Sequence, residues 1–447
     1  MGNKTEQWST KLGFILSSTG AAVGLGAIWK FPYMTGMNGG GAFFLVFIAF
    51  TIIIGLPILI AEFVIGRGAQ KEAVSAYKTL APRSGWSFIG KWGVAGAFLL
   101  LSFYSVVGGW VLLYSLMSIP GMIIKENADY AALFGTITGS PFLTILGLAL
   151  FLLINVIVIS FGIKNGIEKS SKVLMPLLFV FFIILVIRAL TFEGAMEGIT
   201  FFLQPDFSEL TASSILYALG QSFFSLAVGI SVMVTYSSYL KKDVSLPMSA
   251  GMVSIMNIFV SLLAGLAIFP VVFAFGLEPS EGPGLLFIVL PEAFSQMPFG
   301  EVFLSLFLLL FLFAVLTSSF SMLEIITSAF TEKKQRSRKK VASIAGVFIF
   351  IAGIPAALSS SNLSEFKLFG LTIFDASDFL VSNIMLPGGC LFIALFISFK
   401  MDKQLVRNEF FYGNNLPSGM YQLWFQLIRW LVPFTIIIVV LNSFGII

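Results

Sequence analysis

The sequence contains no histidine, a single cysteine and few charged residues. The absence of histidine excludes imidazole metal ligands and histidine general bases, and the lone Cys390 excludes an intramolecular disulfide and a cysteine metal cluster. Only 11% of the 447 residues are charged and 57% are hydrophobic, whereas a soluble domain carries roughly 25% charged residues. The composition therefore predicts a polytopic membrane protein, and we expect neither a nucleic-acid partner nor an enzyme.

Apolar runs of about 20 residues, the length that crosses a bilayer, recur along the chain. Breaks at Gly, Pro and clusters of charge divide them into eleven predicted spans. These spans lie near residues 12–35, 42–66, 90–119, 142–161, 167–190, 212–239, 247–276, 301–329, 341–358, 377–399 and 421–445.

The basic residues are distributed unequally between the two sets of loops. Most of the 26 Lys and Arg lie before the first span or after an even-numbered span, including the run EKKQRSRKK at 332–340. The exceptions, on the opposite side or within the last span, are Lys30, Lys125, Arg188, Lys367 and Arg429. Because cytoplasmic loops collect basic residues, we expect a cell-membrane protein with a cytoplasmic N-terminus and an extracellular C-terminus.

The first and sixth spans carry small and polar residues where a lipid-facing helix has none. The first contains SSTGAAVGLGAIWKFP from Ser17, and the sixth contains GQSFFSLAVGISVMVTYSSYL from Gly220. A GxxxG packing face at Gly20 and Gly24 is a competing explanation for the first span alone. Equivalent breaks in two five-span repeats, the second inverted, instead favour unwound helices that line a central binding site.

Several motifs occur in a characteristic order: GLGAIWKFP from Gly24, NGGGAFF from Asn38, then GQSFFSL and LTSSF. Together they resemble the neurotransmitter:sodium symporter family, specifically its bacterial eleven-span amino-acid transporters, over spans one to ten and most of the eleventh. The resemblance implies an all-α LeuT-type fold with discontinuous helices 1 and 6. It also implies one transporter domain of residues 1–447, with inverted repeats near 12–190 and 212–399 and an extra helix at 421–445.

The resemblance implies a sodium site between spans one and eight. Sodium is a hard cation that favours several oxygen ligands, and hydroxyls deep in an apolar helix supply them. The competing explanation is that these hydroxyls bond back to the preceding helical turn. The implied ligands are backbone oxygens of Gly20, Val23 and Ala314 and the hydroxyls of Thr317 and Ser318.

Two further ion sites of the family are only partly matched. A second sodium site keeps Ala22, Ser225 and Asn257, but Ala27 stands where relatives have an asparagine. We expect that site to be weakened, so transport with one or with two sodium ions is compatible with the sequence. Chloride dependence is also left open, because Phe47 replaces a tyrosine of the anion site. The matching chloride positions are Gln221, Ser225, Asn257 and Ser261.

The same resemblance implies a substrate pocket between spans one and six. Gly24 replaces the aspartate of monoamine transporters, which leaves room for a substrate carboxylate at the amides of Leu25 and Gly26 and the hydroxyl of Tyr104. The substrate ammonium is expected at carbonyls of Ala22, Phe224 and Ser225, and its side chain at Ala21, Leu100, Val107, Ala227, Ile230, Ser318 and Met322.

This uncharged lining predicts sodium-coupled import of a neutral, hydrophobic or aromatic amino acid by alternating access, in a monomer or weak homodimer within membrane lipid. The alternatives are transport of an aromatic or other small amine, and a proton-driven porter that uses Glu62 or Glu324. Otherwise those two glutamates are expected only to take part in buried polar networks.

Gates and a hinge complete the implied mechanism. Lys30 and Asp378 match an outer ion pair, with Tyr104 and Phe224 as a lid below it. At the inner side the basic residue expected at position 5 is replaced by Thr5, with Lys4 as the nearest cation. The residues expected around the inner path are Trp8, Ser238, Tyr239 and Glu332, and the proposed hinge residues of span five are Gly166 and Pro176. A plain helix start with a later proline kink explains that pair equally well.

Overall fold

The computed structural model describes residues 6–125, 128–277, 284–334 and 337–443, without the side chains of 332–334 and 443. Throughout these ranges the regular secondary structure is helical, apart from isolated bridges between Gly40 and Pro205 and between Leu368 and Leu371. The all-α prediction is therefore confirmed.

Nine long apolar helices of the described ranges coincide with nine of the predicted spans. Their lengths follow from uninterrupted hydropathy, because a helix satisfies all its backbone groups internally in lipid. In chain order they are α3–α4 (Gly41–Ala69), α6 (Phe88–Ser118), α8 (Pro141–Ser160), α9 (Lys169–Ala189), α13 (Leu246–Ala274), α15 (Gly300–Lys334), α16 (Arg338–Ala357), α17–α18 (Ile373–Phe399) and α20–α21 (Ser418–Ser443).

The other two predicted spans are broken helices. In the first, α1 (Lys11–Ala22) and the helical stretch Gly26–Met37, which ends in α2, meet at 52°. In the sixth, α11 (Ala212–Leu226) and α12 (Val232–Ser238) are separated by residues 227–231. By length and composition the described residues hold at most ten spans, and the predicted eleventh depends on joining α11 to α12.

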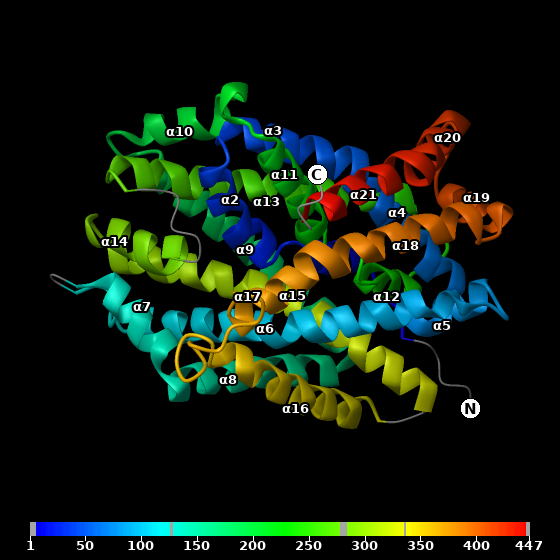
Figure 1. Cartoon of the computed structure of the whole chain (residues 1–447), viewed down its shortest axis with the longest axis horizontal. Coiled ribbons are helices and arrows are strands. Elements are labelled where there is room, and N and C mark those ends of the chain that lie inside the picture. The colour runs from blue at the N-terminus through cyan, green and yellow to red at the C-terminus, as the bar shows by residue number, and fades with distance from the viewer. Residues whose placement is uncertain (1–5, 126–127, 278–283, 335–336, 444–447) are drawn as a thin grey trace.

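Short helices lie at the two ends of the bundle (Figure 1). They were not predicted, since each is too short to cross a bilayer. One end carries α7 (Tyr130–Gly139), α10 (Ala195–Leu203) and α14 (Leu290–Ser295), and the other carries α5 (Ala73–Leu80) and α19 (Lys403–Phe411).

The broken helices are enclosed by longer ones. α1 packs against α9, α13 and α15, while α12 packs against α4. Within its most apolar stretch α6 is 89% buried, whereas α9 and the last span are only 33% buried. The polar breaks therefore lie inside the bundle, and α9 and α20–α21 present outer, lipid-facing sides.

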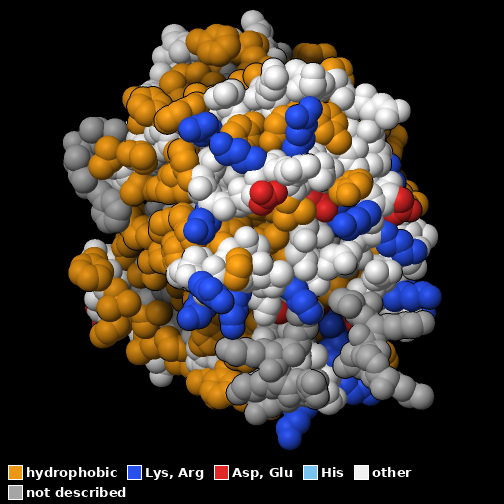
Figure 2. Space-filling view, turned by 90° about the vertical axis from the view of Figure 1, so that its right-hand side faces the viewer, with side chains coloured by type: hydrophobic (Ala, Val, Ile, Leu, Met, Phe, Trp, Pro, Cys, Tyr) orange, Lys and Arg blue, Asp and Glu red, His pale blue; other side chains and the backbone are white. Residues whose placement is uncertain are grey.

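One end of the bundle is basic. Figure 2 looks at the end that carries α5 and α19 and shows Lys and Arg side chains spread across it beside an orange apolar area. Lys78 of α5 and Lys403 of α19 are exposed here. This charge distribution is the one expected of a cytoplasmic face.

Candidate functional site

The break in the first span frees backbone groups in the protein interior. α1 ends at Ala22, and Val23 leaves the helical region with φ −83° and ψ 87°. The Gly24 amide then donates to the Ala22 carbonyl at 3.1 Å. Helical structure resumes only at Gly26. The Ala21 carbonyl, which would continue the helix, instead accepts from the Ser318 hydroxyl of α15 at 3.0 Å.

The break in the sixth span is held by a buried carboxylate. Ala227 and Ser231 have φ of +52° and +57°, in the left-handed region that non-glycine residues seldom adopt. The Glu62 side chain accepts hydrogen bonds from the amides of Gly229 at 2.7 Å and Val234 at 3.2 Å. Glu62 thus replaces the helical acceptors that this segment has lost, which is consistent with the expected network role.

Gly229 allows the close packing of this break. Its φ is +94°, and a Cβ on it would lie 2.2 Å from the Leu386 carbonyl oxygen. Any larger residue would therefore push the unwound segment away from the start of α18.

A small closed cavity lies between the two breaks. Its free volume is about 10 Å³, which is room for about one water molecule, so a larger substrate needs the lining to move apart. Most of the predicted pocket residues surround it, but Ala21, Val107 and Ser225 do not. The lining consists of Ala22, Gly24, Leu25, Gly26, Leu100, Tyr104, Phe224, Ala227, Ile230, Ser318, Met322 and Leu386.

Leu386 is the lining residue that the sequence analysis missed. It begins α18, more than 60 residues from the nearest other member of the lining in the chain. The only local signal is the LPGG sequence at 386–389, where a close backbone approach needs small residues.

Gly24 faces the polar end of the cavity. A Cβ at this position would lie 2.6 Å from the Tyr104 hydroxyl and 2.7 Å from Ser318 Oγ. The Leu25 amide donates to the Tyr104 hydroxyl at 3.3 Å. The Leu25 amide and the Tyr104 hydroxyl thus meet beside Gly24, which has no side chain. None of the lining residues carries a charged side chain.

Two residues of the predicted sodium site, Gly20 of α1 and Thr317 of α15, are in close contact. A Cβ on Gly20 would contact Thr317 at 2.8 Å, and the Ser318 hydroxyl donates to the Ala21 carbonyl at 3.0 Å. The Thr317 hydroxyl bonds back to Phe313 and Ala314. The competing explanation therefore describes the Thr317 hydroxyl, whereas the Ser318 hydroxyl reaches across to α1. A back-bonded hydroxyl oxygen still has a lone pair that can face a cation.

Comparison with known proteins identifies the kind of molecule that carries this site. The sequence model of the Sodium:neurotransmitter symporter family matches residues 5–128 and 140–445. The chain belongs to this family. The family comprises sodium-dependent secondary transporters, not enzymes, and sodium is its coupling ion.

Individual relatives agree over nearly the whole chain. The sodium-dependent transporter YhdH of Bacillus subtilis (strain 168) is 52% identical over 99% of this chain and 98% of its own length. A sodium-dependent transporter of Haemophilus influenzae is 38% identical over 99% of both chains. The crystal structure of MhsT in complex with L-phenylalanine superposes with a TM-score of 0.92 and 42% identity, over 98% of this chain and 100% of MhsT. These matches confirm the LeuT-type fold.

In this symporter several residues of the partly matched ion sites form hydrogen bonds within the protein. The Ser225 hydroxyl donates to Asn257 Oδ1 at 3.0 Å, and Asn257 Nδ2 donates to the Ser225 carbonyl at 2.9 Å. Gln221 Nε2 donates to the Gly26 carbonyl at 2.6 Å. Ser261 is the exception, because its buried hydroxyl has no partner in the described part of the chain. Ala27 is fully buried and adds no side-chain oxygen.

The predicted outer gate pair is in contact. Lys30 Nζ lies 3.1 Å from Asp378 Oδ2 and donates to Ser382 Oγ at 3.2 Å. The ammonium also lies 4.8 Å from the centre of the Phe224 ring, which forms part of the cavity roof. The two charged side chains are 19% and 34% exposed, so this ion pair is partly wet.

Trp8, one of the residues predicted around the inner path, is buried. Its indole Nε1 donates to the Tyr236 carbonyl at 2.8 Å, and its ring meets those of Tyr236 and Tyr239 edge-on. Ser238 is buried beside them and donates to the Thr235 carbonyl at 2.7 Å. Glu332 belongs to the side chains outside the described part of the structure.

A cation lies near these residues at a position that the sequence analysis did not consider. Arg338, at the start of α16, pairs with the fully buried Glu324, and it lies 3.6 Å from Glu6. Tyr239 donates to the same Glu324 at 2.8 Å. The candidates Lys4 and Thr5 lie outside the described residues. Sequence spacing gave no signal, since Glu6 and Arg338 come from opposite parts of the chain.

The predicted hinge region is anchored to the first span. Gly166 lies in a π-helical turn, Ile163–Glu168, and α9 then continues through Pro176 without a break. Glu168 accepts hydrogen bonds from the Ser9 amide at 2.8 Å and the Thr10 hydroxyl at 3.2 Å. The segment before α1 is thus fastened to the turn that holds Gly166.

Proposed function

We propose that this symporter uses inward sodium movement to import a neutral, hydrophobic or aromatic amino acid. The observation that carries the proposal is the Tyr104 hydroxyl, which meets the Leu25 amide at 3.3 Å beside Gly24. A Cβ on Gly24 would lie only 2.6 Å from this hydroxyl, so the position must stay without a side chain. When the lining moves apart, a substrate carboxylate binds here and accepts from Tyr104 and the amides of the unwound helix. The apolar remainder of the cavity suits a neutral side chain, and MhsT, 42% identical, has been crystallised with L-phenylalanine.

In the proposed cycle, sodium and the substrate each hold a different pair of helices together. Sodium at the Gly20 and Thr317 oxygens holds α1 against α15 and favours an outward-open state. Substrate then bridges α1 and α11, and Lys30 closes against Asp378. Release requires the segment around Trp8 to leave α12. Residues 1–447 act as one domain, built from repeats near 12–190 and 212–399 and an extra helix at 421–445.

The basic end shown in Figure 2 supports a cytoplasmic N-terminus and an extracellular C-terminus in this proposal. Trp8 then closes the cytoplasmic path and Lys30 the extracellular one. A cysteine at an exposed residue of α5, labelled only in opened vesicles, would check this orientation.

The test is thermal stabilisation of the purified protein by a panel of amino acids and their decarboxylated amines. Each is measured in NaCl, KCl and choline chloride at fixed pH. We expect stabilisation by neutral amino acids in NaCl alone. Stabilisation by amines alone would overturn the carboxylate site in favour of an amine transporter, and equal stabilisation in choline would favour a proton-driven porter.

A matched pair of tyrosine variants sharpens this test. Tyr104→Phe removes the hydroxyl beside Gly24, and hydrogen bonds to charged groups are worth about 1.5–3 kcal/mol, so amino-acid affinity should fall at least about ten-fold. Tyr114→Phe is the control, since Tyr114 lies buried in the same helix and its hydroxyl has no partner among the described residues. Equal affinities for the two variants would place the carboxylate elsewhere.

A further inference from the structure

Arg429 is a charged residue inside the last span that the transport mechanism does not use. It lies in the π-helical turn Leu427–Leu431 between α20 and α21. A charge at such a position is costly in lipid and calls for a partner or a polar surrounding. The group that pairs with Arg429 therefore indicates what the residue does.

The protein itself supplies Arg429 with aromatic rings and no acid. Its guanidinium carbon lies 5.0 Å from the Trp430 ring centre and 5.2 Å from the Phe399 ring centre. Nε is buried and has no hydrogen-bond partner within the described ranges. No carboxylate of those ranges lies within ion-pair distance of it. A guanidinium has five N–H donors, so an acceptor from outside the chain is needed.

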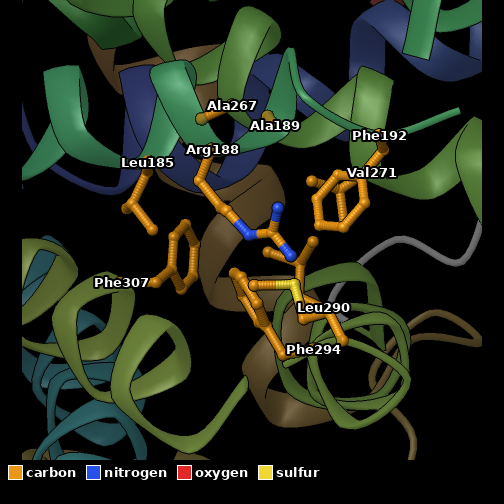
Figure 3. Close-up of a pocket in the computed structure, with 10 residues that line it drawn as sticks. Leu185, Arg188, Ala189, Phe192, Ala267, Val271, Leu290, Phe294 and Phe307 are labelled. Carbon is orange, nitrogen blue, oxygen red and sulfur yellow. The ribbon is translucent and has the colours of Figure 1, made fainter. Parts of the chain in front are cut away.

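Other arginines of the spans are satisfied within the protein. Arg67 pairs with Glu409 at 2.6 Å, and Arg338 pairs with Glu324. Arg188 donates to the Thr191 hydroxyl at 2.7 Å. Figure 3 shows the Arg188 guanidinium pointing into an apolar pocket between Phe192, Phe294 and Phe307. Arg429 differs from all three because its buried nitrogen has no acceptor.

The surroundings of Arg429 face lipid. Trp430, Phe434 and Leu423 of the same span are each at least 60% exposed. Phe399 is exposed as well, and it is the last residue of α18. Long side chains on a helix point back toward its N-terminus, so the Arg429 guanidinium reaches toward the end of α18. The exposed Lys400 follows at that end, and lysines at the ends of spans reach toward the lipid headgroups.

We propose that Arg429, flanked by Phe399 and Trp430, binds the phosphate of an anionic phospholipid in the leaflet beside the end of α18. A phosphodiester accepts two parallel N–H bonds from one guanidinium, and reaching the buried Nε requires the Arg429 side chain to turn outward. Acyl chains then lie along the exposed apolar face of α20–α21. A net negative headgroup is favoured over a zwitterionic one, because Lys400 and Lys403 add positive charge at the same end.

The test compares Arg429→Met with Arg188→Met in the purified full-length protein. Bound lipid is counted by native mass spectrometry, and the shift in Tm is recorded on adding phosphatidylglycerol, phosphatidylcholine or inorganic phosphate. We expect phosphatidylglycerol to raise the Tm of the wild-type protein and of Arg188→Met. For Arg429→Met its affinity should fall about five-fold, the usual effect of one basic residue near an anionic surface. Arg429→Lys should restore part of the affinity.

Three results would overturn the proposal. Equal phosphatidylglycerol affinity in Arg429→Met and Arg188→Met would show that the guanidinium does not hold the lipid. An equal Tm shift with inorganic phosphate would identify a free-anion site. Loss of a dimer in Arg429→Met, without any change in lipid affinity, would assign the exposed face to a second copy of the chain. Size-exclusion chromatography of each variant confirms that it is folded.

Discussion

In the proposed cycle, the two ends of the transport path are closed by different chemistry. The outer closure is one ion pair, Lys30 with Asp378, whose side chains are 19% and 34% exposed. The inner closure combines the buried Trp8, the fully buried Glu324 and Arg338. A partly wet ion pair is worth little and is easily remade, whereas a buried charge that loses its partner is expensive. The inner closure is therefore expected to depend far more on each of its members.

The largest effect is expected from Arg338→Met, which leaves Glu324 buried without its cation. Breaking a buried pair in this way costs about 3–5 kcal/mol, so the Tm should fall strongly and uptake should be lost. Thermal unfolding in detergent measures the difference. The double variant Arg338→Met with Glu324→Gln is the control, and it should recover most of the stability. A single variant as stable as the wild-type protein would show that the inner network does not hold the closed state.

A smaller effect is expected from Glu168→Gln, which weakens the attachment of the first span to the Gly166 turn. The substitution removes the charge that accepts from Ser9 and pairs with Lys172 at 2.6 Å. Charge-assisted hydrogen bonds contribute about 1.5–3 kcal/mol, and we expect faster amide exchange in residues 6–13. Lys169→Gln is the matched control with little effect, because this exposed lysine of the same helix makes no ion pair within the described ranges. Unchanged exchange in Glu168→Gln would argue against this attachment.

The outer pair gives the contrasting result. Asp378→Asn removes one charge of a partly exposed pair, for which about 0.2–1 kcal/mol is typical, so stability should hardly change. Uptake should still slow, because the substituted asparagine carries no charge to hold the Lys30 ammonium over the Phe224 ring. Comparing Tm and initial uptake rate in Asp378→Asn and Arg338→Met tests the asymmetry directly. A Tm loss as large as that of Arg338→Met would remove the distinction between the two closures.

The contrast also shows what the sequence could predict. Hydropathy located the long helices, because each span must satisfy its own backbone, and the glycines of GLGAIWKFP marked the break in the first. The positions that match the family's motifs included most residues of the cavity lining. The role of Arg338 was not predicted, because its pairing with Glu6 and Glu324 depends on how α16 packs against the N-terminal segment. Leu386 was not predicted for the same reason. It contacts the unwound residue Gly229, and no periodicity in the sequence indicates that contact.

The smallest effect is expected from removing chloride. Gln221, Asn257 and Ser225 each donate a hydrogen bond within the protein, and Phe47 is fully buried with no hydroxyl to offer. Among these residues Ser261 keeps a buried hydroxyl without a partner in the described ranges, and Gln221 keeps an unpaired buried Oε1, which cannot donate to an anion. A single neutral donor is a poor anion site because the desolvation of chloride is left uncompensated. Substrate-dependent stabilisation should therefore be equal in NaCl and in sodium gluconate. If gluconate abolished it, chloride would have to draw these amides away from Gly26 and Ser225, and the substitution Ser261→Ala should then reproduce the loss.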